Sequence, residues 1–106
     1  MYQRGDVWKV KLYPTRGAEQ DGIRPCLIVS PNSLNSNLEN VIVLPMTKSL
    51  KPWPTRVELT LNQVAGQACI EHIRSVSKTR LIEKLGTISL DELATISKRL
   101  QATFAL

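Results

Sequence analysis

The sequence has few of the residues that build metal centres and disulfide frameworks. It contains one histidine, His72, and two cysteines, Cys26 and Cys69, among 106 residues, and no C-x-x-C pair. Each cysteine lies in an apolar run, where cysteine usually behaves as a small buried hydrophobic residue. A disulfide and a zinc site are therefore the minor interpretations, and we expect the chemistry of this chain to use no metal and no cofactor.

Long apolar runs and low-complexity segments are also missing. No window approaches the ~20 apolar residues of a membrane span, and residues 1–5 lack the apolar core of a signal peptide. Glycine (5 residues) and proline (6 residues) are too scarce, and the hydrophobic content of 42% is too high, for a disordered chain. We expect a single domain over residues 1–106 that acts in the cytoplasm, away from membranes.

The charged residues are unbalanced but spread along the chain. Lys and Arg number 14 against 9 Asp and Glu, which gives a net charge of +5 without a polybasic tail. An excess of positive charge fits an anionic partner such as a nucleic acid. It fits a solvated basic surface about equally well, so the charge alone does not decide the function.

Proline and apolar alternation divide the first half of the chain into strands. Residues 6–13 alternate between two faces, as a half-buried strand does, and Pro14 ends them. A polar loop follows over residues 14–23, and Arg24-Pro25 opens a second strand that runs to Ser30. The apolar run 41–44, ended by Pro45, predicts a buried third strand.

The second half of the chain predicts two further strands and a helix. Residues 56–61 alternate, residues 66–76 have the composition of a strand, and a helical turn is expected near residues 78–81. Ser89 and Glu92 have the spacing of a capping box, and an apolar stripe follows at helical spacing. These five strands predict a small, mostly antiparallel, partly closed β-barrel with a C-terminal helix.

Three residues at strand ends or in loops have side chains suited to binding. Arg24 presents a fork of donors that suits a phosphate, although a salt bridge with Glu19 or Asp21 is an equal alternative. Thr47 follows a buried strand, where a hydroxyl often satisfies a turn. Trp53, between two prolines in a loop, is expected at the surface, where it can stack on a base or fill a partner's pocket.

Several ordered motifs together point to one known family. They are the RGDV opening, the PTRG-x-EQ loop, the RP of the second strand, the P-x-T after the third, and the IR-x-V-x-K-x-RL block. In this order and spacing the chain resembles, over its whole length, the MazF/PemK family of type II toxin-antitoxin ribonucleases. The resemblance implies a homodimeric SH3-like barrel of the MazF/PemK/CcdB type. It further implies sequence-specific, metal-independent cleavage of single-stranded RNA, inhibition by a cognate antitoxin, and indirect contact with operator DNA through that antitoxin.

The resemblance also implies roles for individual residues. It assigns catalysis to Arg24 and Thr47, and it places the loops 14–23 and 48–55 beside the RNA. The expected RNA-binding residues in and beside these loops are Arg16, Gln20, Lys48, Lys51, Trp53 and Arg56.

The general base is left open among three residues. An arginine with a pKa above ~12 rarely loses its proton, so Glu19, Glu71 and His72 are further candidates for the catalytic set. Many relatives have Asp-Gln where this chain has Glu71-His72. On a strand the two side chains point to opposite faces, and His72 on its own is more often structural. If it faces the RNA groove, activity gains a pH dependence near ~6.5.

Metal-free cleavage is chemically reasonable because the 2′-hydroxyl of the RNA can attack its own phosphate. Such a reaction leaves a 2′,3′-cyclic phosphate and a 5′-hydroxyl. Two alternatives stay open. One is a non-catalytic poison of gyrase, like the CcdB toxins, which share the barrel and act through the C-terminal helix. The other is an RNA-binding barrel that does not cleave, for which the basic charge and Trp53 suffice.

Overall fold

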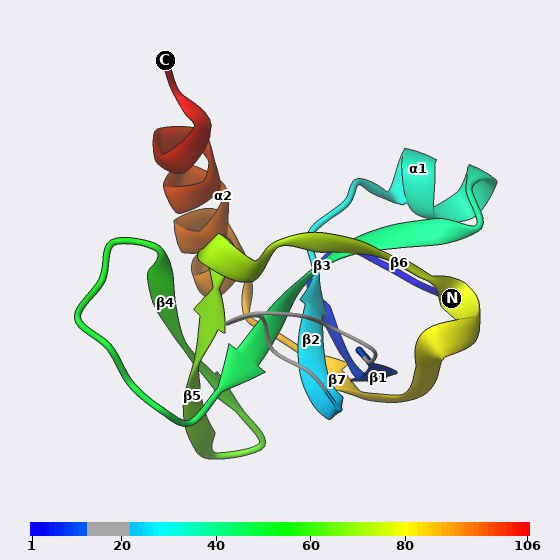
Figure 1. The fold of residues 1–106 in the computed structure, drawn as a ribbon, viewed down its shortest axis with the longest axis horizontal. Coiled ribbons are helices and arrows are strands. Elements are labelled where there is room, and N and C mark those ends of the chain that lie inside the picture. The colour runs from blue at the N-terminus through cyan, green and yellow to red at the C-terminus, as the bar shows by residue number, and fades with distance from the viewer. Residues whose placement is uncertain (13–21) are drawn as a thin grey trace.

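A computed structural model describes residues 1–12 and 22–106 (Figure 1). Within these ranges, seven strands form one curled antiparallel sheet, and α2 lies beside the β4–β5 hairpin. The elements in chain order are β1 (Asp6–Lys11), β2 (Ile23–Ile28), α1 (Asn32–Asn37), β3 (Asn40–Thr47), β4 (Arg56–Leu61), β5 (Val64–Cys69), the 3-10 turn η1 (Ile70–His72), β6 (Arg74–Ser77), the 3-10 turn η2 (Lys78–Arg80), β7 (Leu81–Thr87) and α2 (Leu90–Phe104). The predicted small, mostly antiparallel, partly closed barrel with a C-terminal helix is confirmed.

The long strand β3 organises the sheet. On one edge, residues 43–45 of β3 pair with β2. On the other edge, residues 40–43 pair with β6 and residues 46–47 pair with β5. The strands follow the order β4-β5-β3-β2-β1-β7, so β4 and β7 are the edges of this path.

Pro45 does not end its strand, contrary to the sequence prediction. Residues 44 and 45 of β3 have no partner in β5 or β6, so a residue without an N–H donor is tolerated there. Opposite these two residues lies the longer stretch 69–73, whose extra residues form η1. The predicted strand 66–76 is therefore wrong in its middle, where a 3-10 turn separates β5 from β6.

The strand β7 was not predicted from the sequence. Its first residue is buried, the next three are exposed, two are half-buried, and the last is exposed. This is not the alternation of an amphipathic strand. Irregular pairing with β1 explains this, because the register shifts twice, beside Trp8 and beside Val10. A bulged strand does not keep its side chains in strict alternation.

The two faces of the sheet carry separate apolar clusters. Leu27, Leu44 and Leu59 belong to the cluster that α2 covers with Ile96, its one buried residue. Val10, Ile28 and Val43 belong to the second cluster, against which Trp8 packs. Consecutive positions of one strand enter opposite clusters, as the period of a strand requires.

The opening RGDV segment has a structural role. Asp6 is 1% exposed and accepts hydrogen bonds from the Gln3 N–H at 3.1 Å and the Thr87 hydroxyl at 3.0 Å. The Lys84 ammonium lies 3.4 Å from the same carboxylate. A buried carboxylate with these partners fastens the start of β1 to β7.

The predicted capping box at the start of α2 is confirmed. Ser89 accepts a hydrogen bond from the Glu92 N–H, and Glu92 accepts one from the Ser89 N–H. Glu92 also accepts from the Thr60 N–H at 2.8 Å, which joins the helix to β4. In the described part of the chain, every helix is too short or too polar to cross a membrane.

Candidate functional site

The structure brings Arg24 and Thr47 together at one pocket. Arg24 lies at the start of β2 and Thr47 at the end of β3. The antiparallel register pairs Cys26 with Pro45. Arg24 comes two residues before Cys26 and Thr47 two residues after Pro45, so both lie at the same end of the β2–β3 pair. Both line a pocket of about 390 Å³, which we call the Arg24–Thr47 pocket. The RP and P-x-T motifs therefore meet in space because their strands are neighbours.

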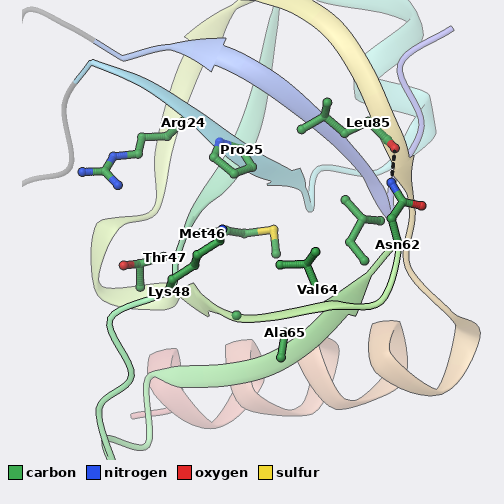
Figure 2. Close-up of a pocket in the computed structure, with 11 residues that line it drawn as sticks. Arg24, Pro25, Met46, Thr47, Lys48, Asn62, Val64, Ala65 and Leu85 are labelled. Atoms are coloured by element: carbon green, nitrogen blue, oxygen red, sulfur yellow. Dashed lines mark hydrogen bonds between the residues drawn. The ribbon is translucent and has the colours of Figure 1, made fainter.

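The walls of this pocket are mostly apolar. They are formed by side chains that include Pro25, Met46, Leu61, Val64 and Leu85. Figure 2 shows Arg24, Thr47 and Lys48 at one end of the pocket and Asn62 with Leu85 at the other. Charged and hydroxyl groups thus stand at the rim of an apolar recess, where weak solvation strengthens electrostatic interactions.

Thr47 is held in a fixed position. Its hydroxyl oxygen accepts a hydrogen bond from the Ser49 N–H at 3.0 Å, and a hydroxyl in that state still has its own proton to donate. Gly66 of β5 passes so close that a Cβ there would stand 3.0 Å from the Thr47 carbonyl oxygen. Only glycine allows this close approach without a shift of the β3 backbone.

The β4–β5 turn is a part of the pocket that sequence reasoning missed. Asn62 and Gln63 have φ values of 51° and 67°, in the left-handed region that asparagine tolerates better than most residues. The Asn62 side chain donates a hydrogen bond to the Leu85 carbonyl at 3.2 Å (Figure 2). This bond fixes the hairpin against β7. The signal was Asn-Gln between two strand-like segments.

Other predicted RNA-binding residues line a second hollow. Lys51, Trp53 and Arg56 border a depression of about 600 Å³ together with Arg99 of α2, and we call it the Trp53 hollow. Trp53 is 47% exposed, as its proline-flanked loop predicts. Lys48 belongs instead to the Arg24–Thr47 pocket. The expected RNA-binding residues are thus divided between two places.

Arg56 is a largely buried side chain with several partners. Only 7% of its side chain is exposed, and its Nε donates to the Glu71 carboxylate. Its Nη1 donates to the Ser49 carbonyl at 3.1 Å and lies 3.4 Å from the Gln67 side-chain oxygen. Its guanidinium also lies 4.8 Å from the centroid of the Trp53 ring. Arg56 therefore holds the loop and the tryptophan in place.

Glu71 and His72 do not point to opposite faces of a strand, as the sequence suggested. Both lie in η1, with the His72 Nε2 3.9 Å from the Glu71 carboxylate. Neither is among the described residues that line the Arg24–Thr47 pocket. Partial burial alone would raise the pKa of Glu71, but hydrogen bonds from Arg56, its own backbone and Thr55 outweigh it and lower the pKa.

The late IRSVSKTRL block supports the end of β1. Arg74 donates to the Leu12 carbonyl at 3.1 Å, and Arg80 reaches the Lys11 carbonyl at 3.5 Å. The Leu12 N–H donates to the Gly22 carbonyl at 2.7 Å and draws β1 and β2 together. The predicted site residues Arg16, Glu19 and Gln20 lie outside the described residues.

Both cysteines are buried. Burial raises the pKa of the Cys26 thiol to about 12, so the nucleophilic thiolate is scarce at neutral pH. Cys69 is fully buried as well. Over residues 1–12 and 22–106, no three His, Cys, Asp or Glu side chains come close enough together to hold a metal ion.

Comparison with known proteins agrees with this fold and length. A crystal structure of MazF from Deinococcus radiodurans matches with a TM-score of 0.87 and 28% identity over 99% of this chain and 97% of that one. The endoribonuclease MazF9 of Mycobacterium tuberculosis is 33% identical over 95% of this chain and 94% of its own length. A structure described as a mycobacterial endoribonuclease in complex with its cognate antitoxin shares the fold, with a TM-score of 0.86 and 24% identity over 100% of this chain and 97% of that one.

The half-barrel with its helix is thus the architecture of MazF structures. The model of PemK-like, MazF-like toxins of type II toxin-antitoxin systems matches residues 3–104. The chain belongs to this toxin family.

Proposed function

We propose that this chain, acting as one domain over residues 1–106, is a sequence-specific endoribonuclease toxin that cleaves single-stranded RNA without a metal. The observation that carries the proposal is the convergence of Arg24 and Thr47 on one pocket. Membership of the PemK-like, MazF-like family and the endoribonuclease name of a 33% identical relative support the same activity.

The reaction uses groups that the RNA and the pocket supply. The 2′-hydroxyl oxygen bonds to the adjacent phosphorus, the bond from phosphorus to the 5′-oxygen breaks, and the products are a 2′,3′-cyclic phosphate and a 5′-hydroxyl. Arg24 binds the phosphate and stabilises the negative charge that grows in the transition state. Thr47 donates the proton of its hydroxyl, as a hydrogen bond, to a phosphate oxygen.

The 2′-hydroxyl gives up one proton to a base, and the departing 5′-oxygen takes one proton from a water molecule. A carboxylate or an imidazole is the chemically reasonable acceptor, because arginine holds its proton at neutral pH. Glu19, of the 14–23 loop, is our candidate for this role. It precedes Arg24 by five residues in the sequence, in a loop that the family resemblance places beside the RNA.

We further propose a homodimer that a cognate antitoxin inhibits in the cytoplasm. A mycobacterial endoribonuclease that shares this fold forms a complex with its own cognate antitoxin, which supports a partner of the same kind here. A dimer doubles the net charge of +5 over one surface, which favours RNA binding. Contact with operator DNA is expected through the antitoxin.

The test is cleavage of single-stranded RNA by the purified protein in excess chelator, with analysis of the product ends. We expect cleavage at one short sequence, with cyclic phosphate and 5′-hydroxyl ends. Absence of cleavage of any RNA would contradict the endoribonuclease. Loss of cleavage in chelator would contradict the metal-free reaction.

The two alternatives give different outcomes in the same assay. A non-cleaving RNA-binding barrel retains RNA without cutting it. A CcdB-like poison shows neither cleavage nor RNA binding and inhibits gyrase instead.

A further inference from the structure

The Trp53 hollow combines basic side chains with an exposed aromatic ring. Lys51, Arg56 and Arg99 line it, and Glu58 is the one carboxylate among the described lining residues. Arg99 donates through Nη1 to the carbonyls of Pro54 and Arg56, at 2.9 and 3.4 Å, and a guanidinium has further donors to offer. The net charge of the lining is positive, so a phosphate is a suitable ligand.

The tryptophan itself rests on a rigid support. The Arg56 guanidinium lies 4.8 Å from the indole centroid, a cation–π distance, and is held by Glu71, Ser49 and Gln67. Gln67 in turn is 4% exposed and bonds both backbone groups of Lys51 at 3.0 Å. The support therefore consists of side chains whose own positions are fixed.

Part of the indole nevertheless stays open to solvent, with the Lys51 ammonium 5.8 Å from the ring centroid. Trp53 is 47% exposed, and the neighbouring Pro52 and Pro54 restrict the loop backbone. A ring that is already ordered loses little conformational entropy when a ligand stacks on it. Nucleobases stack on such rings in single-strand binders whatever their sequence.

We propose that Trp53 is a stacking platform for one unpaired base of the RNA substrate, with Lys51 and Arg99 bound to the phosphates beside that base. Arg56 and Glu71 are positioning residues that hold the indole. The inference rests on the proposed function, because it adds a nucleotide subsite for the same substrate. Lys48 lines the Arg24–Thr47 pocket, and Lys51 lines the hollow. Their Cα atoms are three residues apart and therefore at most about 11 Å from each other, so a short single strand of RNA reaches both places.

Binding without cleavage gives the direct test. The probe is a labelled random-sequence pool of short single-stranded oligonucleotides with 2′-fluoro sugars, which lack the attacking hydroxyl. We expect Trp53→Ala to weaken binding by about 5- to 150-fold, the equivalent of ~1–3 kcal/mol per stacked base. Trp53→Phe is expected to keep most of the affinity, because phenylalanine also offers a ring for stacking. Wild type is expected to show quenching of indole fluorescence when the oligonucleotides bind, and Trp53→Phe is expected to lose this quenching.

Two matched controls separate the platform from general surface effects. Phe104→Ala removes another exposed aromatic ring, 61% exposed at the end of α2, and is expected to leave binding within twofold. Lys98→Ala removes an exposed charge next to Arg99 in the chain, and it is expected to weaken binding less than Arg99→Ala. The platform would be overturned if Phe104→Ala lost as much affinity as Trp53→Ala, and Lys98→Ala as much as Arg99→Ala.

The positioning role of Glu71 has its own readout in the cleavage assay. Glu71→Gln is expected to raise KM for RNA several-fold while kcat stays within about twofold. A fall of 100-fold in kcat at unchanged KM would instead make Glu71 a catalytic residue and overturn the positioning role.

Failure of the platform and failure of the proposed function give different results. If Trp53→Ala binds the pool within twofold of wild type and wild type still cleaves RNA, only the platform is wrong. If wild type does not cleave any RNA, the proposed function is wrong, and the binding experiment still decides the platform. Weaker antitoxin binding in Trp53→Ala with unchanged RNA binding would assign the hollow to a protein partner and overturn the RNA subsite.

Discussion

The Arg24–Thr47 pocket and the Trp53 hollow differ in the surroundings they give to charge. The first is an apolar recess with an arginine and a hydroxyl at one end, and the second is a basic depression beside an exposed indole. An apolar recess strengthens the few polar contacts that a transition state makes, whereas a solvated basic surface attracts RNA without favouring one step of a reaction. The difference teaches that a basic surface is not by itself evidence of catalysis. In our proposal, the apolar recess is the place for cleavage and the basic hollow is a place for RNA binding.

The largest expected effect is the loss of the polar groups in the apolar recess. Arg24→Ala and Thr47→Val are each expected to lower kcat by about 10²- to 10³-fold, the usual result of removing one preorganised donor. Thr47→Ser is the matched control, because it keeps the hydroxyl. Cleavage rates at saturating RNA measure the effect, and full activity of Thr47→Val would remove Thr47 from the reaction.

A smaller effect is expected from Gly66→Ala, which acts on Thr47 through the backbone. The new methyl group would stand 3.0 Å from the Thr47 carbonyl oxygen, so β3 must shift by a few tenths of an ångström. We expect about a tenfold fall in kcat, since small displacements of catalytic groups are costly. Gly86→Ala is the comparison, because its methyl would meet the flexible end of Leu61 rather than a backbone atom. Equal kcat values for the two variants would contradict this reason.

The ion pair between Arg56 and Glu71, which supports Trp53, is expected to make a pH-dependent contribution to the free energy of unfolding. Because the pKa of Glu71 is lowered in the folded state, its contribution is present above the unfolded value of about 4.3 and is lost as pH falls through the lowered value. Glu71→Gln is expected to lower the free energy of unfolding at pH 7 by about 1 kcal/mol or less. Urea unfolding of both proteins from pH 7 to pH 3 should show the difference shrink toward acid, and a constant difference would contradict the ion pair.

The smallest effect on activity is expected at the helix cap, because Ser89 and Glu92 line neither site. Ser89→Ala removes the acceptor for the Glu92 N–H and is expected to cost about 1 kcal/mol of stability. Thermal unfolding measures this loss. Cleavage at a temperature well below the transition should be unchanged, so a large loss of kcat would show that α2 takes part in the site.

Much of the fold was predictable because its signals are local. The alternation of β1 and β4 and the capping box of α2 depend on residues within a few positions of each other. The course of β3 through Pro45 was not predictable, since it depends on which residues of β5 and β6 lie opposite. The pairing of β3 with β5 and β6 also explains why Glu71 and His72 lie in a 3-10 turn between these two strands.

The candidate site was predictable in its residues more than in its grouping. Arg24 and Thr47 followed from motifs, and the register of β2 and β3 brings them together. The sequence placed Lys48 and Lys51 in one loop, but the fold directs them to different hollows. The burial of Arg56 and its pairing with Glu71 depend on contacts 15 residues apart in the sequence.

The most direct test of separate places for cleavage and binding measures two quantities in both Thr47→Val and Trp53→Ala. The quantities are kcat at saturating RNA and the affinity for the 2′-fluoro pool. We predict that Thr47→Val loses at least 100-fold in kcat with affinity within about threefold of wild type, whereas Trp53→Ala loses affinity with kcat largely kept. The same loss of both quantities in both variants would contradict the division of cleavage and binding between the two places.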